Sequence, residues 1–440
     1  MSAISPTSQV GRNRILRFAQ NDEGDYNGLM IQRGVASFGL DYGHCPPWLF
    51  MRMVKLGREM VEILVAEYGP DEFVRRIADP VWFQSLGTVL AFDWNASGLT
   101  TILTAALKEA IRGQERDLGI FICGGKGKTS RKTPDEIQEW GGRLALPSAQ
   151  AKNLVYNSKM SAKVDSALVQ DGFQLYHHSF FFSLKQNGGL SPDTQKNDSR
   201  IGAWAVVQQG MNVEKGAARR YHWFSEDIKD LIEEPHSGIS SQAVIKTVLD
   251  MTSHRSGKTR DISTELVQAG YAPLMKDINL LRKYSSPLSQ MVKVEEQPFG
   301  GTQGKQLTLL NLETKEFKYH PVVRENFSKS KYLEKVLAQV TEQKPKTYEE
   351  LVSLKGVGPK TVRALALVGE VIYGAAPSYE DPARYSFAHG GKDATPYPVD
   401  RETYDQTIAM LAGAVRKTRL SSNEKERAVG RLRNARQTML

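Results

Sequence analysis

A chain of 440 residues is too long for one hydrophobic core, because single cores stop growing at roughly 250–300 residues, so several domains are expected. Its composition, 40% hydrophobic and 24% charged, is that of a globular protein and excludes an intrinsically disordered chain. The net charge of +9 favours a polyanionic partner. Only two cysteines are present, Cys45 and Cys123, which fits a reducing compartment and excludes a four-thiolate zinc site. No apolar run approaches the ~20 residues that cross a bilayer and no signal sequence is evident, so we expect a cytoplasmic protein without membrane contact.

The N-terminal third reads as mainly helical after a polar start. Residues 1–29 are aperiodic, which indicates a disordered tail or a misassigned start codon before Met30. From Trp48 the apolar residues recur at helical spacing until Gly69 and Pro70, and a second helix is predicted over Thr100–Ile111. One short strand is predicted in the segment GIFICGG.

The middle third has the composition of a sheet. The segments FQLYHHSFFFSL and WAVVQQGM are rich in aromatic and β-branched residues and flank a polar loop, so we expect an antiparallel strand pair. A further strand is predicted in GKQLTLLNL. The fold class expected is therefore mixed α+β, with a small antiparallel sheet in a central α/β region. The divisions expected are 1–29 (tail), 30–150 (helical region), 151–312 (catalytic region), 313–345 (connector) and 346–440 (DNA-binding domain with a basic tail).

Near the C-terminus, the segment LVSLKGVGPKTVRALALVGEVIYG predicts two helices joined by a glycine-rich turn. Thr347 followed three residues later by Glu350 is a capping-box pattern, and Pro359 suits the first position of the second helix. Glycines can leave main-chain N–H groups open at a helix N-terminus, which is a good site for an anion. The segment resembles the helix-hairpin-helix motif, which holds DNA phosphates without reading bases. The residues predicted to contact phosphate here are Gly356, Gly358, Lys360 and Thr361.

Two further basic segments suit a nucleic acid. Residues 416–440 contain eight Lys or Arg and two Glu, and the segment GGKGKTSRK contributes Lys126, Lys128 and Arg131 as phosphate contacts. This second segment lacks the glycine spacing of a P-loop, so no nucleotide cofactor is expected.

A cluster of polar residues in the central strands is the predicted catalytic centre. Adjacent residues on a strand point to opposite faces, so one of each neighbouring pair can share a face with an incoming Arg or His. Histidine can transfer a proton near neutral pH, and arginine can hold a phosphate. Two nearby carboxylates, Asp165 and Asp171, could bind Mg²⁺ or Mn²⁺. The predicted catalytic residues are His177, His178, Gln208, Gln209, Arg220 and His222.

Several segments are similar to the DUF763 family of prokaryotic proteins. They include RGVASFGLDYG, DPVWFQSLGTVLAFDWNASGLTT, GGKGKTSRKTPDEI, LYHHSFFF, WAVVQQGMN, ARRYHWFS, EEPHSGI and DPARYSFAHGGKDATPYPVD. The resemblance extends from about residue 32 to 435 and implies a connection with DNA.

Three functions are compatible with these patterns. The first is a metal-dependent nuclease acting on single-stranded or branched DNA, with the hairpin and the basic tail holding the backbone. The second is a helix-hairpin-helix glycosylase and lyase that uses the amine of Lys360 and the carboxylate of Asp400. The third is a DNA-binding scaffold without catalysis. The partner expected in each case is DNA, bound without sequence preference, and the sequence leaves the oligomeric state open.

Overall fold

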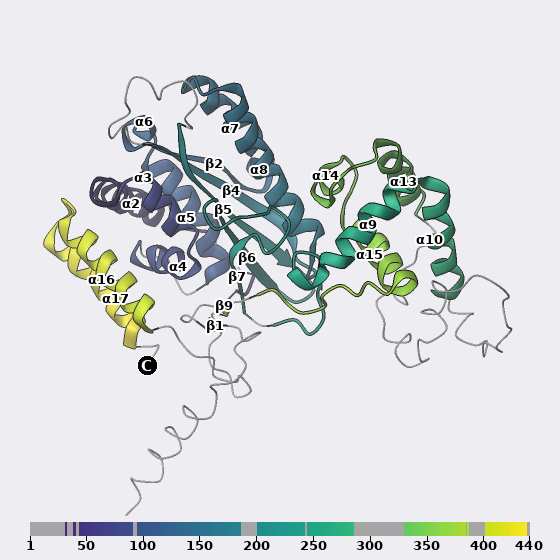
Figure 1. Ribbon diagram of the computed structural model, residues 1–440. Coiled ribbons are helices and arrows are strands. Elements are labelled where there is room, and N and C mark those ends of the chain that lie inside the picture. The colour runs from purple at the N-terminus through teal and green to yellow at the C-terminus, as the bar shows by residue number, and fades with distance from the viewer. Residues whose placement is uncertain are drawn as a thin grey trace, which may run out of the picture.

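The computed structural model describes residues 31–32, 38–40, 44–90, 95–185, 200–242, 244–285, 330–383, 385–386 and 401–437. Within these ranges an antiparallel sheet lies in the centre and helices lie on both sides of it, which confirms the mixed α+β class (Figure 1). The strand predicted in GKQLTLLNL and the predicted tail 1–29 lie outside the described residues.

The central sheet is antiparallel over the strands β2-β4-β5-β6-β7. Two short strands, β9 and β1, extend it in parallel beyond β7. A separate small sheet pairs β3 with β8. The strands are β1 (Ile31–Gln32), β2 (Ile120–Lys126), β3 (Val169–Gln170), β4 (Gln174–Leu184), β5 (Ile201–Asn212), β6 (Ala217–Phe224), β7 (His236–Ser241), β8 (Leu249–Asp250) and β9 (Tyr385–Ser386).

Strands β4 and β5 confirm the antiparallel pair predicted on either side of the polar loop. Phe180, Phe181 and Phe182 are consecutive and have no exposed surface, so both faces of β4 are covered. A strand that is buried on both faces carries a continuous apolar run instead of alternating with polar residues. This is why the aromatic segments of the sequence predict these strands correctly. Strand β2 confirms the strand predicted in GIFICGG.

The N-terminal helices cover one face of the sheet. Helix α3 contacts β4 and β5, while α5 contacts β2 and β6. Leu99, Phe83 and Phe181 belong to the hydrophobic core between these helices and the sheet. Helices α2 and α5 confirm the two helices predicted in this region. The bounds are α2 (Pro47–Tyr68), α3 (Pro70–Ile77), α4 (Pro80–Val89), α5 (Ala96–Ala110) and α6 (Glu115–Leu118).

The opposite face is covered by α7 (Thr133–Arg143) and α8 (Ser148–Ala167), which contact β2, β4 and β5. A 3₁₀ turn, η1 (Gly127–Lys132), joins β2 to α7. Beyond α8 a group of helices lies to one side of the sheet (Figure 1, right). It consists of α9 (Gly257–Gln268), α10 (Tyr271–Ser285), α13 (Lys331–Gln343), α14 (Tyr348–Ser353) and α15 (Pro359–Tyr373).

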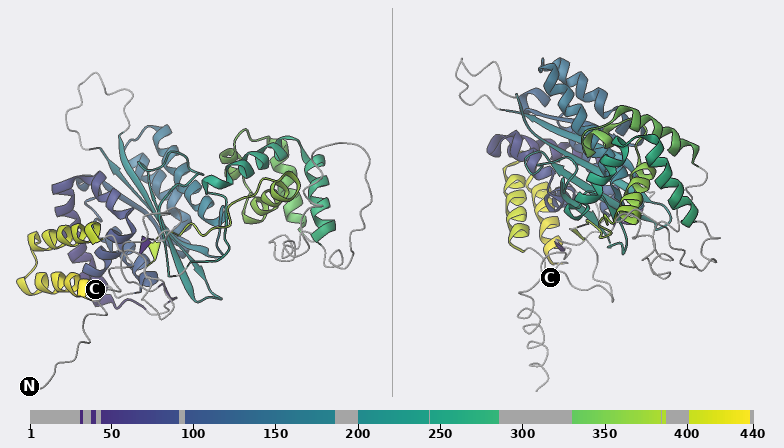
Figure 2. Two further views of the ribbon diagram at one scale, coloured as in Figure 1. Left: turned by 60° about the horizontal axis from the view of Figure 1, so that its bottom comes forward. Right: turned by 45° about the vertical axis from the view of Figure 1, so that its right-hand side comes forward.

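The C-terminal helices α16 (Arg401–Lys417) and α17 (Ser422–Gln437) pack on α2 and α4, on the other side of the molecule from α14 and α15 (Figure 2). Leu411, Val415 and Ala428 are buried in the same core as α2–α5. The basic C-terminal segment is therefore helical and packed against the N-terminal helices. No helix in the described part of the chain has the length and apolar content to cross a membrane.

Candidate functional site

The predicted helical hairpin is formed by α14 and α15. Thr347 caps α14, because its hydroxyl oxygen accepts a hydrogen bond from the backbone N–H of Glu350 at 3.1 Å. The Glu350 carboxylate accepts a hydrogen bond from the N–H of Lys346 (2.7 Å). In a standard capping box the donor is the N-cap residue itself, so here the donor is shifted by one residue. Pro359 is the first residue of α15, where its missing N–H removes no helical hydrogen bond.

The two glycines of the connecting turn differ in their backbone. Gly356 has φ +93°, and a Cβ atom there would lie 3.1 Å from Cγ2 of Val336, so the turn itself favours glycine. Gly358 is extended, with φ −150° and ψ −171°, and a Cβ atom there would meet nothing within 4 Å. Packing within the described chain therefore does not require glycine at position 358.

The turn is held from behind by polar side chains. Lys163 of α8 donates to the carbonyl of Leu354 at 2.6 Å, and Gln170 of β3 donates to the carbonyl of Pro359 at 2.9 Å. Arg363 in turn donates to the Gln170 amide oxygen at 2.7 Å. These bonds hold the carbonyls of Leu354 and Pro359 against α8 and β3.

The front of the turn is open. Lys360 is exposed, while Gly356 and Gly358 are half-buried. Thr361 as a whole is only 2% exposed, so neither its hydroxyl nor its backbone N–H has much contact with solvent, contrary to the predicted phosphate contact. In the first turn of α15, the N–H groups of Lys360 and Thr361 have no hydrogen-bond acceptor among the described residues.

The second predicted phosphate-binding segment lies at the end of β2. Lys126, Lys128 and Arg131 are exposed there. The ammonium of Lys126 lies 5.9 Å from the centre of the Tyr176 ring. These cations are available to an anion, and η1 itself has no buried residue.

The predicted catalytic residues occupy both faces of the sheet. In the register of the strands, His177 lies opposite Gln209 and Gln209 opposite Arg220, as expected from the alternation of side chains. His178 and Gln208 point to the other face. The six predicted residues are therefore not brought together in one site.

Helices seal both groups. Toward α5, Nε2 of His177 lies 3.3 Å from a threonine hydroxyl, and Gln209 donates to a backbone carbonyl at 2.9 Å. Arg220 donates to the amide oxygen of a glutamine of α4 (3.2 Å), and His222 Nδ1 lies 3.2 Å from the carbonyl of Ile77. None of these side chains is more than 1% exposed.

Burial makes these histidines weak bases. Removal from water lowers the pKa of His177 to about 3 and that of His178 to about 4. The pKa of His222 falls well below its ordinary value, mainly through burial and also through the nearby Arg220. Burial also lowers the pKa of Arg220, to about 9. Near pH 7 the three imidazoles are therefore neutral hydrogen-bonding groups.

The two carboxylates predicted to bind a metal lie in separate networks. Asp171 accepts bonds from Tyr221 (2.6 Å), from the guanidinium of Arg219 (3.1 Å) and from a backbone N–H (2.9 Å). Arg219 also pairs with Asp381 at 2.7 Å, which ties the segment after α15 to the sheet. Because protein donors occupy Asp171, it does not fit a divalent cation. Within the described ranges, no group of three or more His, Cys, Asp or Glu side chains is arranged to hold a metal ion.

Asp165 is paired with His236, a contact that sequence reasoning missed. Its buried carboxylate accepts bonds from Gln208 (2.5 Å), Trp223 (3.1 Å) and Nε2 of His236 (2.5 Å). The His236 ring also packs edge-on against Trp223, with ring centres 5.0 Å apart. Its side chain is 7% exposed, and Nδ1 has no hydrogen-bond partner in the described structure. A carboxylate that fixes one imidazole nitrogen and leaves the other accessible is the arrangement of a general base.

The sequence contained one indirect signal for this pair, the segment EEPHSGI that resembles the DUF763 family. Asp165 and His236 are 71 positions apart, so spacing along the chain could not join them. The other predicted pair, Lys360 with Asp400, cannot be placed, because Asp400 lies outside the described residues.

Comparison with known protein families gives a match over most of the chain. The family model described as "Protein of unknown function (DUF763)" matches residues 34–399. The matched range contains the antiparallel strands of the central sheet and the α14–α15 hairpin, and it ends just before α16. Neither a curated protein nor a solved structure is significantly similar to the chain.

Proposed function

The chain belongs to the DUF763 family, and we propose that it binds DNA by using the α14–α15 hairpin as a helix-hairpin-helix motif. The observation that carries the proposal is the open first turn of α15. The N–H group of the exposed residue Lys360 lies in the first turn of the helix, where the helix dipole adds partial positive charge. A backbone phosphate fits such a site, and the exposed Lys360 ammonium supplies a counter-charge.

Gly358 supports this proposal because no contact within the described chain explains it. A glycine on the open side of the turn lets a phosphate approach the main chain closely, and any side chain would cover the amides. Contacts of this kind read no bases, so we expect binding to be independent of DNA sequence.

The first test compares Gly358→Val with the wild-type protein in fluorescence-anisotropy titrations against single-stranded, duplex and forked DNA. We expect all affinities to fall together, by roughly tenfold, because losing charge-assisted hydrogen bonds weakens binding by about 1.5 kcal/mol or more. Stability should be nearly unchanged, since the extended backbone at position 358 accommodates valine. Gly142→Val, another site where a Cβ meets nothing within 4 Å, is the matched control and should bind normally.

An unchanged affinity of Gly358→Val for every DNA would overturn the hairpin proposal, and a loss confined to one DNA sequence would contradict backbone recognition. Titrating RNA of the same sequences alongside decides whether the sugar matters to the site.

We further propose, as a second candidate, that the bound DNA is cleaved at a phosphodiester. The Asp165–His236 pair favours it. His236 Nδ1 would accept a proton from water while the water oxygen bonds to phosphorus. As the bond between phosphorus and the leaving oxygen breaks, that oxygen would take a proton from solvent water. Asp165 would orient the ring through Nε2 and is a positioning residue.

The cleavage proposal is tested by incubating labelled forked DNA with the protein, with and without EDTA, Mg²⁺ and Mn²⁺. Cleavage that EDTA abolishes and Mn²⁺ restores would support the metal-dependent form, with the cation on oxygens other than those of Asp171. His236→Gln should remove cleavage while leaving DNA binding intact. Full cleavage by His236→Gln would exclude this residue as the base.

The lyase alternative has its own signature. If Lys360 attacked an abasic site, borohydride would trap a covalent protein–DNA adduct that Lys360→Ala cannot form. Binding without cleavage or trapping would leave the scaffold function.

A further inference from the structure

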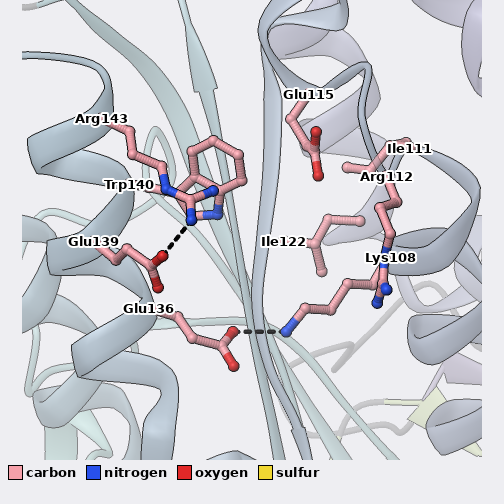
Figure 3. A pocket seen from close by; sticks show the side chains of 9 residues that line it. All are labelled: Lys108, Ile111, Arg112, Glu115, Ile122, Glu136, Glu139, Trp140 and Arg143. Atoms are coloured by element: carbon pink, nitrogen blue, oxygen red, sulfur yellow. Dashed lines mark hydrogen bonds and ion pairs between the residues drawn. The ribbon is translucent and has the colours of Figure 1, made fainter.

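A hollow of about 420 Å³ lies on the free edge of the sheet, far from the hairpin turn in sequence (Figure 3). Its floor is Ile122 of β2, the outermost strand of the sheet on this side. Trp140 and Glu139 of α7 line one wall, and Arg112 and Glu115 line the other. Neither the sequence patterns nor the proposed DNA-binding turn involves this hollow.

The main chain of Ile122 faces the hollow. Two residues later, the N–H of Gly124 donates to Glu136 (2.8 Å) and its carbonyl accepts from Lys108 (3.1 Å), so this residue points away from β4. The odd-numbered positions face β4 instead: the carbonyl of Gly119 accepts a hydrogen bond from the N–H of Leu184 in β4 (2.9 Å). Because strand residues alternate, Ile122 directs both its N–H and its C=O outward. Neither group has a hydrogen-bond partner in the part of the chain that the structure describes.

Two polar contacts join the elements on either side of the hollow. Lys108 and Glu136 form an ion pair (2.6 Å) across β2 at one end. At the other end, Arg116 donates to the carbonyl of Arg143 at 2.7 Å. Because Glu136 and Lys108 occupy the outward N–H and C=O of Gly124, an added β-strand could not pair along the edge of β2, so the hollow suits a small ligand better than a strand.

The walls specify the kind of ligand. The Trp140 ring lies beside Phe121, with ring centres 4.9 Å apart, and the Arg143 guanidinium lies over the Trp140 ring, 5.1 Å from its centre. Opposite it, the Glu115 carboxylate bonds only to the N–H of Gly113 among the described residues, so it can accept further hydrogen bonds. A donor and an acceptor side by side on a strand edge match the donor–acceptor edge of a nucleobase.

We propose that this hollow binds a nucleobase that carries an exocyclic amino group. The base edge bonds to the N–H and C=O of Ile122, its ring lies in the hollow beside Trp140 and Arg143, and Glu115 accepts a bond from the amino group. Lys108 and Arg112 also line the hollow, paired with Glu136 and Glu109, and are the cations assigned to a phosphate attached to the base. The base can belong to a free nucleotide or to a polynucleotide.

The test titrates wild-type protein with adenosine, cytidine, uridine and N6,N6-dimethyladenosine by calorimetry, up to millimolar concentrations. We expect adenosine and cytidine to bind, uridine to bind roughly tenfold more weakly, and dimethyladenosine not to bind, because sites built for a donor reject analogues that lack it. No binding of any nucleoside, or equal binding of adenosine and its dimethyl analogue, would overturn the proposal.

Variants locate the site. Glu115→Gln keeps the bond to Gly113 and should weaken adenosine binding roughly fivefold through loss of the charge. Glu214→Gln, an exposed change in the turn between β5 and β6, should have no effect. Equal adenosine affinity of these two variants would contradict the placement.

A last measurement distinguishes binding at this hollow from binding at the hairpin. Gly358→Val should bind adenosine and adenosine monophosphate normally whether or not DNA binding through the hairpin is correct. If binding is seen only with oligo(dA) and disappears in Gly358→Val, the base is not held at β2 and the proposal fails.

Discussion

Gly356 and Gly358 stand in the same turn, but only Gly356 has a backbone conformation that favours glycine. Gly356→Ala should lower the free energy of unfolding by roughly 1–2 kcal/mol, because a non-glycine residue at positive φ is strained and its Cβ presses on Val336. Gly358→Ala should change it by less than about 0.5 kcal/mol. Urea denaturation followed by circular dichroism measures both values. Equal losses in the two variants would mean that position 358 serves packing, and the argument for an approaching phosphate would weaken.

The buried histidines make a prediction about pH. His177, His178 and His222 are held neutral by burial, with the first two pKa values lowered to about 3 and 4, whereas an unfolded histidine titrates near 6.5. The unfolded chain therefore binds more protons at moderately acidic pH. The stability due to these side chains is complete above about pH 6.5 and is lost as pH falls toward the folded pKa values, by up to about 1.4 kcal/mol per pH unit for each histidine.

Unfolding free energies measured between pH 7.5 and 5 test this point. Relative to the wild type, His177→Gln should show a shallower fall, since one proton uptake is removed. His44→Gln, at an exposed histidine, is the control and should leave the slope unchanged. A wild-type slope near zero would show that the imidazoles are protonated without unfolding.

Among the elements, α8 connects the sheet to the hairpin. Asp165 on this helix faces the sheet and bonds to His236, while Lys163 reaches the carbonyl of Leu354 in the turn. Lys163→Met should free the turn, so the amides near Val357 and Lys360 should exchange hydrogen faster and DNA should bind several-fold more weakly. Lys159→Met removes the same charge from an exposed position of α8 and is the matched control. Similar losses of binding in both variants would indicate a charge effect without a role for the bond to Leu354.

Local patterns predict several of the elements in this chain and few of its contacts. Helix α2 follows from apolar spacing and from Gly69 at its end, and α14 follows from the Thr347 cap. The pair β4–β5 follows from two aromatic segments around a polar loop. The pairing of Asp165 with His236 and the hollow over Ile122 depend on residues brought together by the sheet, so sequence spacing carries no sign of them.

At the scale of the whole molecule, the sheet separates two hydrophobic cores. One contains the hairpin helices with α7 and α8, and the other contains α2–α5 together with α16 and α17. The C-terminal helices are attached by polar contacts as well, including the ion pair of Lys417 with Glu67 and the bond from the Arg419 N–H to Glu59 (3.1 Å). Residues so distant in sequence cannot be paired from local patterns. This is why the sequence analysis assigned the basic segment to the same region, 346–440, as the hairpin. The α14–α15 hairpin and the basic helices α16 and α17 lie on opposite sides of the protein (Figure 2).

This separation predicts that DNA length decides which cations take part. An eight-nucleotide single strand held at the hairpin should lose about one phosphate contact in Lys360→Ala, so the slope of log affinity against log salt should fall by roughly 0.7 to 1. The double variant Arg416→Ala with Arg427→Ala, at exposed residues of α16 and α17, should leave that slope unchanged. On a duplex of about 60 base pairs that can bend around the protein, both variants should lower the slope. If the α16–α17 variant lowered the slope for the short strand while Lys360→Ala did not, the C-terminal helices would be the primary DNA site and the hairpin would not.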